Sequence, residues 1–114
     1  MLTLYGISNC DTVKKARKWL EQAALEYQFH DFRADGLTPA MVQAWLDELG
    51  AETLVNKRST TWKQLTEAER EQALGADAAA LICQHPTLIK RPLLDTGSSR
   101  QVGFSAANYQ QLLG

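Results

Sequence analysis

Within the first twenty residues, the pattern of hydrophobic and polar residues changes from one typical of a strand to one typical of a helix. Residues 2–5 (LTLY) are apolar or β-prone, which predicts a short buried strand that Gly6 is expected to break. Apolar residues then recur at helical spacing and predict a helix that begins near Asp11; they are Val13, Ala16, Leu20 and Ala23. Cys10 therefore lies on the predicted turn between strand and helix, after the turn-forming pair Ser8–Asn9.

A second strand is predicted at residues 26–32 (EYQFHDF), where aromatic and polar residues alternate. A helix between two strands is typical of a β-α-β unit, whose strands are parallel and whose crossover is right-handed. The first third of the chain therefore predicts a parallel strand pair.

The middle of the chain is predicted to be helical. Thr38 and Pro39 suit the N-cap and first position of a helix, and Gly50 suits its end. The stripe that this helix is expected to bury consists of Val42, Trp45, Leu46 and Leu49. Residues 51–61 are polar and irregular, which predicts a loop, and a short helical turn is expected at 62–65.

Two more short helices are expected before the last third. Residues 66–69 (TEAE) form a capping box, which predicts a helix over 67–74 that Gly75 ends. Asp77 is expected to cap a helix over 78–84, and a proline two residues later ends it.

The last third is strand-like. Residues 88–95 (LIKRPLLD) and 100–104 (RQVGF) flank the turn cluster 96–99 (TGSS), which predicts a β-hairpin. Pro92 cannot donate to a sheet ladder, so an edge, a bend or a cis bond must accommodate it. Ser105 is expected to cap a closing helix.

The order β-α-β, helical stretch, β-β-α predicts an α/β protein with one mixed four-stranded sheet and helices on its faces. The closing helix is expected to run to about Leu113. This is the outline of a thioredoxin-like fold, in a single domain over 1–114 with a helical insertion at about 38–85.

Composition narrows the class of protein. With 114 residues, a net charge of −1 and ordinary hydrophobic content, the chain predicts one domain with a modest core and gives no reason to expect nucleic acid as a partner. No apolar stretch is long enough to cross a membrane, and the N-terminus is typical of a strand rather than a signal peptide. Two distant cysteines, Cys10 and Cys83, favour a reduced, cytoplasmic protein.

Cys10 is the candidate nucleophile. Unpaired N–H groups at a helix N-terminus stabilise a thiolate and can hold an oxyanion, and cysteines so placed titrate at about 3.5–7.5 rather than near 8.5. The alternative is a buried, inert cysteine that packs like a small hydrophobic side chain. A basic run follows, with Lys14 nearest the sulfur; on its own it suits a solvated helix face (Lys14, Lys15, Arg17 and Lys18).

Other chemistries find less support. Cys83 is expected to be a core cysteine rather than a resolving one, and His30 and His85 lack partners at catalytic or metal-ligand spacing. A phosphatase loop needs an arginine six residues after its cysteine, where this chain has Ala16.

Three segments together resemble the arsenate reductase (ArsC-type) family of thioredoxin-fold proteins: YGISNCDTVKKARKWL, QHPTLIKRP and RQVGF. The sequence is most similar to the YffB-type branch, which is thought to contain glutathione-dependent thiol reductases, and next to the Spx-type transcriptional regulators. The resemblance implies that Cys10 is the nucleophile, that Arg91 binds the substrate anion, and that the bond before Pro92 is cis.

Three positions depart from the family's patterns. Where arsenate reductases have two further arginines, this chain has Asn56, with Arg58 two residues later, and Phe104. The arsenate-binding set is thus incomplete. Spx-type proteins often have a second cysteine three residues after the first, where this chain has Val13, so an intramolecular C-x-x-C switch is impossible.

The expected function is that of a glutathione-dependent thiol/disulfide or oxyanion reductase, an oxidoreductase with one cysteine nucleophile. Without a neighbouring resolving cysteine, an external thiol must complete the cycle, so glutathione is the expected electron donor and no bound cofactor or metal is expected. The partners implied are glutathione, a small-molecule or protein disulfide, and glutaredoxin. The residues expected around the substrate are Asn9, Asp11, Thr12, Lys14, Arg58, Arg91 and Pro92.

Two of these assignments have structural alternatives. Arg91 and Arg58 suit the carboxylates of glutathione, but Arg91 could instead form an ion pair with Asp95. Asp11 and Thr12 could orient the loop, or Asp11 could only favour the helix dipole. For the whole chain, the alternative function is an Spx-like regulator or binding module that contacts RNA polymerase without catalysis.

Overall fold

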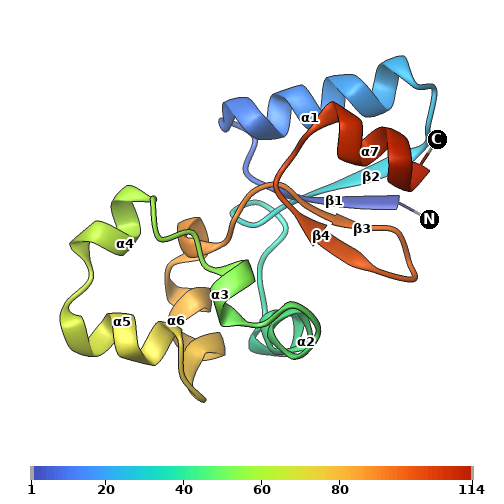
Figure 1. Cartoon of the computed structure of the whole chain (residues 1–114). Helices are drawn as coiled ribbons and strands as arrows, with labels where there is room; N and C mark the ends of the chain where they lie inside the picture. Colours follow the sequence, from blue (N-terminus) through green and yellow to red (C-terminus); the bar gives the residue numbers. More distant parts are fainter. Residues whose placement is uncertain (1, 114) are drawn as a thin grey trace. The chain divides into compact units, whose positions relative to one another are not determined.

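A computed structural model describes residues 2–113. The chain forms two compact units. One comprises the residues up to Asp35 together with those from Arg91 onward, and the other is Gly36–Lys90. The first unit carries the sheet and Cys10, and the second is helical (Figure 1).

The first unit contains the predicted four-stranded mixed sheet, with strand order β2-β1-β3-β4. Strand β1 (Leu2–Gly6) pairs parallel with β2 (Tyr27–Asp31) and antiparallel with β3 (Leu93–Asp95). Strand β4 (Arg100–Val102) pairs antiparallel with β3. The parallel pair and the hairpin expected from the sequence are both confirmed. Strand β1 ends at Gly6, as expected, although Gly6 itself still pairs with Asp31, so the strand is one residue longer than the predicted 2–5.

Helices α1 (Asp11–Gln22) and α7 (Ala106–Leu113) lie on the same face of the sheet (Figure 1). They contribute to one buried cluster, which consists of Leu4, Ala16, Leu20, Leu94 and Tyr109. The ring of Tyr109 meets those of Trp19 and Phe104 edge to face, at centroid distances of 5.6 and 4.8 Å. Ala23, expected in the buried stripe, is exposed, because α1 ends one residue before it.

The hydroxyl of Tyr109 is buried and has no hydrogen-bond partner within residues 2–113, and burial raises its pKa. A buried polar group without a partner costs stability, so we expect Tyr109→Phe to raise the free energy of unfolding by about 1 kcal/mol in urea titration. Tyr27→Phe is the matched control, because that hydroxyl accepts from Arg17 Nε (3.1 Å) and donates to Glu21 (3.3 Å). We expect the control to lose stability. A Tyr109→Phe variant less stable than its parent would contradict this prediction.

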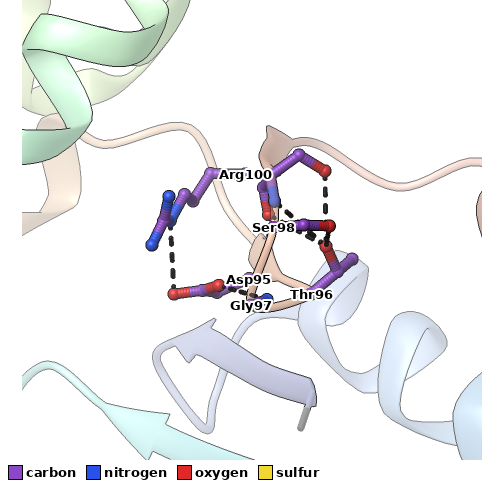
Figure 2. Close-up of polar contacts among 6 residues, drawn as sticks. Asp95, Thr96, Gly97, Ser98 and Arg100 are labelled. Carbon is purple, nitrogen blue, oxygen red and sulfur yellow. Dashed lines mark hydrogen bonds and ion pairs between the residues drawn. The ribbon is translucent and has the colours of Figure 1, made fainter.

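The hairpin between β3 and β4 is held by side chains of its own turn (Figure 2). Asp95 Oδ1 accepts a hydrogen bond from Gly97 N at 2.8 Å, and Asp95 Oδ2 lies 3.4 Å from Arg100 Nε. Thr96 Oγ1 accepts from Ser99 N at 3.2 Å. Both hairpin strands are shorter than predicted. The residues before Pro92 do not join the sheet, and β4 ends before Gly103, whose φ is +82°.

In the second unit the predicted caps are confirmed for two helices. Thr38 Oγ1 accepts from Met41 N at the start of α2 (Pro39–Leu49), and Thr66 and Glu69 complete the capping box of α5 (Glu67–Ala73). Helix α6 (Ala78–Gln84) has Asp77 at its N-cap, but the Asp77 side chain makes no capping hydrogen bond, which corrects the expected role.

Residues 51–61 are not the loop predicted from their polarity. Helix α3 (Ala51–Leu54) occupies the start of this segment, and α4 (Thr60–Gln64) begins at its end, because Ser59 Oγ caps Trp62 N at 3.1 Å. Val55 forms a bridge with Ile89, after the 3₁₀ turn η1 (Pro86–Leu88). No helix within the described part of the chain is long and apolar enough to cross a membrane.

Candidate active site

Cys10 occupies the N-cap of α1, as predicted. Its backbone is extended (φ −99°, ψ 126°), and its carbonyl accepts the first bond of the helix from Lys14 N at 2.9 Å. On the other side, Cys10 N donates to Ile7 O at 3.3 Å, which closes a tight turn. The conformation of Cys10 is therefore fixed from both directions by the backbone.

The Cys10 side chain is a free thiol and is half-exposed, which rules out the alternative of a fully buried cysteine. Because the first amide groups of a 12-residue helix lack intrahelical acceptors, they favour negative charge beside this residue. The Cys10 residue is therefore partly accessible to solvent, and it lies at the positive end of the helix dipole.

Close packing between Gly6 and Val13 sets the approach of β1 to α1. A Cβ atom added at Gly6 would lie 2.7 Å from Val13 Cγ2, and Val13 is fully buried. Only glycine leaves room for the helix at this distance. The turn that carries Cys10 lies between these two residues, so their contact limits where the turn can lie.

Arg91 and Pro92 lie at the end of the central strands β1 and β3 where the Cys10 turn also begins. In the antiparallel pairing of β1 with β3, Tyr5 faces Leu93, so the two residues before Leu93 arrive beside the end of β1. The Arg91–Pro92 bond is cis, as the family resemblance implies, and Pro92 O accepts from Gly103 N at 2.8 Å. Arg91 Nε is buried. Asp95, considered as a structural partner for Arg91, forms an ion pair with Arg100.

The remaining predicted residues of the first unit surround the turn and the start of α1. Four of them are exposed: Asn9, Asp11, Thr12 and Lys14. Further along the helix, a shallow depression of about 560 Å³ is lined by Lys14, Arg17, Lys18, Glu21 and Gln22. Arg17 is not simply solvated, because its guanidinium carbon lies 4.3 Å from the centre of the Phe29 ring.

Arg58 belongs to the second unit. Its backbone N–H donates to Asn56 Oδ1 at 3.0 Å, and Asn56 N donates to Leu88 O at 2.7 Å. These bonds give Arg58 an ordered backbone within its own unit, and its side chain is exposed. A role for Arg58 toward Cys10 stays a prediction.

Cys83 lies half-buried on α6, and burial raises the pKa of its thiol. A raised pKa leaves less thiolate at neutral pH, so we expect iodoacetamide at pH 7 to label Cys10 at least about ten times faster than Cys83. Peptide mapping by mass spectrometry at timed intervals measures both rates in the same sample. The difference should disappear in denaturant, and equal rates in the folded chain would contradict the prediction.

The chain has two histidines, His30 and His85. The ring of His30 lies 4.9 Å from that of Tyr5, and His85 N donates to the carbonyls of Leu81 and Ile82 at the end of α6. Among residues 2–113, no group of three or more histidine, cysteine, aspartate or glutamate side chains could hold a metal ion.

One contact of the site was not predicted from the sequence. Asp31 Oδ2 accepts from Ser8 N at 3.3 Å, which ties the end of β2 to the Cys10 turn. Asp31 and Ser8 are 23 residues apart, and no local pattern marks either one as a partner of the other. Only the parallel register of β1 with β2 brings them together.

Comparison with known proteins places the chain in a family. The ArsC family model matches residues 5–112. An uncharacterized protein of Haemophilus influenzae is 43% identical over 110 residues, which are 96% of each chain. The solved structure of a YffB protein superimposes with a TM-score of 0.93 at 38% identity and covers 100% of both chains. Global transcriptional regulator Spx 2 of Bacillus anthracis is 27% identical, over 99% of this chain and 87% of that protein. The thioredoxin-like arrangement of the sheet and the extent of these matches agree, and the chain belongs to the ArsC family.

Proposed function

We propose that this protein is a glutathione-dependent thiol/disulfide reductase that uses Cys10 as its single nucleophile. The observation that carries the proposal is the half-exposed Cys10 thiol at the N-cap of α1. The turn that holds it follows β1, at the end of the strands where Arg91 and the cis Pro92 lead into β3. A half-exposed thiol at a helix N-terminus, at the end of the strands where an arginine enters the sheet, suits attack on a disulfide that carries negative charge.

The reaction proceeds in two exchanges. The Cys10 thiolate attacks the glutathione sulfur of a mixed disulfide, so the Cys10–glutathione bond forms and the substrate leaves as a thiolate that takes up a proton. A glutathione thiolate then attacks this new disulfide and releases Cys10 as thiolate together with oxidised glutathione. Each cycle consumes one reduced glutathione and one mixed disulfide and releases one oxidised glutathione, whose reduction by glutathione reductase takes two electrons from NADPH. Val13 stands where a resolving cysteine would lie, which is why the second thiol comes from outside.

Arg91 and Arg58 are the proposed partners of the glutathione carboxylates, since guanidinium groups bind carboxylates through two parallel hydrogen bonds. Asn9, Asp11, Thr12 and Lys14 line the approach to the sulfur from the turn and the first helical turn. Pro92, which directly precedes β3, is proposed to offer backbone groups to the substrate at the same end of the strands. Glutaredoxin is a proposed alternative to free glutathione in the second exchange.

The test is turnover of the mixed disulfide of cysteine and glutathione, coupled to glutathione reductase so that NADPH is consumed. The proposal expects a rate proportional to protein concentration and dependent on reduced glutathione. Arsenate in place of the disulfide is expected to be a poor substrate, because Asn56 and Phe104 stand where arsenate reductases have arginines. If the assay showed no glutathione-dependent turnover even at high protein concentration, the proposal would be overturned.

A regulatory function is the second candidate, and the similarity to the Spx 2 regulator of Bacillus anthracis favours it. In this alternative the protein contacts RNA polymerase and Cys10 is incidental. Co-purification with purified polymerase subunits tests it. Stable binding that survives Cys10→Ser, together with no turnover, would favour the regulator over the reductase.

A further inference from the structure

The carboxylate of Asp31 connects two segments of the first unit. Its Oδ1 accepts from Arg33 N at 2.8 Å and from Ala34 N at 3.3 Å, which shapes the loop after β2. Its Oδ2 faces the other way and accepts from Ser8 N at 3.3 Å. The backbone supports the same connection, since Phe32 N donates to Gly6 O at 2.9 Å.

These bonds use both oxygens of the side chain as acceptors, which suits an ionised carboxylate best. Burial alone would raise the pKa of Asp31, but the hydrogen bonds from Arg33, Ala34 and Ser8 outweigh it and hold the pKa below its usual range. The side chain is therefore a double acceptor at neutral pH. A neutral amide in its place has one acceptor oxygen and cannot serve both segments.

Ser8 lies two residues before Cys10, in the turn that Cys10 N closes by donating to Ile7 O. Ser8 and Asn9 are both exposed, so packing does little to hold the middle of this turn. The bond from Ser8 N to Asp31 anchors that exposed section to the sheet.

We propose that Asp31 is a positioning residue for the nucleophile: through Ser8 it fixes the turn that presents Cys10 at the N-terminus of α1. The effect on the turn stands on geometry, and its consequence for turnover rests on the proposed function of Cys10. A purely local role, in which Asp31 shapes only residues 31–34, is the alternative that an experiment must separate.

Asp31→Asn separates the two roles. If the single acceptor oxygen of the new side chain stays toward Arg33 N and Ala34 N, its amide NH₂ group faces Ser8 N–H, so two donors meet. Asp35→Asn is the matched control. Asp35 Oδ2 accepts from Asp31 N at 2.9 Å in the same loop, so this change removes one negative charge nearby without touching Ser8. Asp31→Ser is a second variant, because a serine hydroxyl can still accept from the amide two residues on but is too short to reach Ser8.

Two measurements report on the conformation of the turn that holds Ser8 and Cys10. The first is the hydrogen-exchange rate of the Ser8 amide by NMR, and the second is the rate at which iodoacetamide labels Cys10 at pH 7. We expect Asp31→Asn and Asp31→Ser to expose the Ser8 amide to exchange and to slow Cys10 labelling about fivefold, as the loss of one net hydrogen bond allows. Asp35→Asn should stay within about twofold of the parent in both measurements.

Each outcome bears on the proposal. If the Asp31 variants match Asp35→Asn in Ser8 exchange and Cys10 labelling, Asp31 shapes only its own loop and the positioning role is overturned. If Asp31→Asn does not fold, Asp31→Ser decides between the same two results. A parent protein that shows the expected split between variants but forms no adduct with oxidised glutathione would overturn the reductase while leaving the role of Asp31 in the turn intact.

Discussion

Replacing Cys10 with serine is expected to abolish glutathione-dependent disulfide reduction. A serine hydroxyl stays protonated at neutral pH and forms no disulfide, so neither of the two exchanges can begin. The variant should keep its fold, because the Cys10 side chain makes no capping hydrogen bond within the described chain and serine is itself a favoured N-cap residue. The NADPH-coupled assay with the mixed disulfide of cysteine and glutathione measures the loss.

Cys83→Ser is the control for this prediction. Cys83 lies half-buried on α6, and burial raises the pKa of its thiol, which makes it a poor nucleophile at neutral pH. We expect this variant to keep turnover close to that of the parent. If Cys10→Ser were as active as Cys83→Ser, the assignment of the nucleophile would be wrong.

Gly6→Ala is expected to have the largest effect on stability. The new methyl group would lie 2.7 Å from Val13 Cγ2, and Val13 is both fully buried and restricted about its χ1 bond. Neither side chain can give way, so α1 must move from β1 at a cost of about 1–3 kcal/mol. That is a large part of the roughly 5–15 kcal/mol that stabilises a domain. Urea titration followed by circular dichroism measures the change.

Val13→Ala provides the matched test of this mechanism. Alone it leaves a cavity and is expected to destabilise the protein, but combined with Gly6→Ala it makes room for the new methyl group. The double variant should therefore be more stable than the sum of the two single changes indicates. Strict additivity would show that the Gly6 effect does not come from the contact with Val13.

The elements that the sequence predicts well are those that local chemistry decides. The helix that begins at Asp11 follows from apolar spacing, and the start of α5 follows from its capping box, since both signals lie within a few residues of the boundary. The position of Cys10 at the N-cap is predictable for the same reason. The cis bond before Pro92 followed from the family resemblance, and the missing N–H of proline allowed it as one of three options.

Other features depend on partners that are distant in sequence. The predicted strand over 88–95 begins only at Leu93, because Ile89 pairs with Val55 and Pro86 starts a 3₁₀ turn. Gly6 was expected to end the first strand, and it does, but the sequence does not show that its missing side chain also leaves room for Val13 of α1. The residue pattern within one segment does not show which distant segment will pack or pair with it.

The central claim is that Cys10 is an accessible nucleophile that exchanges with glutathione disulfides. Incubating the native chain with oxidised glutathione at pH 7, then digesting it and mapping the peptides by mass spectrometry, tests this claim most directly. The account predicts one glutathione adduct, on the peptide containing Cys10, that dithiothreitol removes. An adduct found on Cys83 alone, or no adduct while iodoacetamide still labels Cys10, would contradict it.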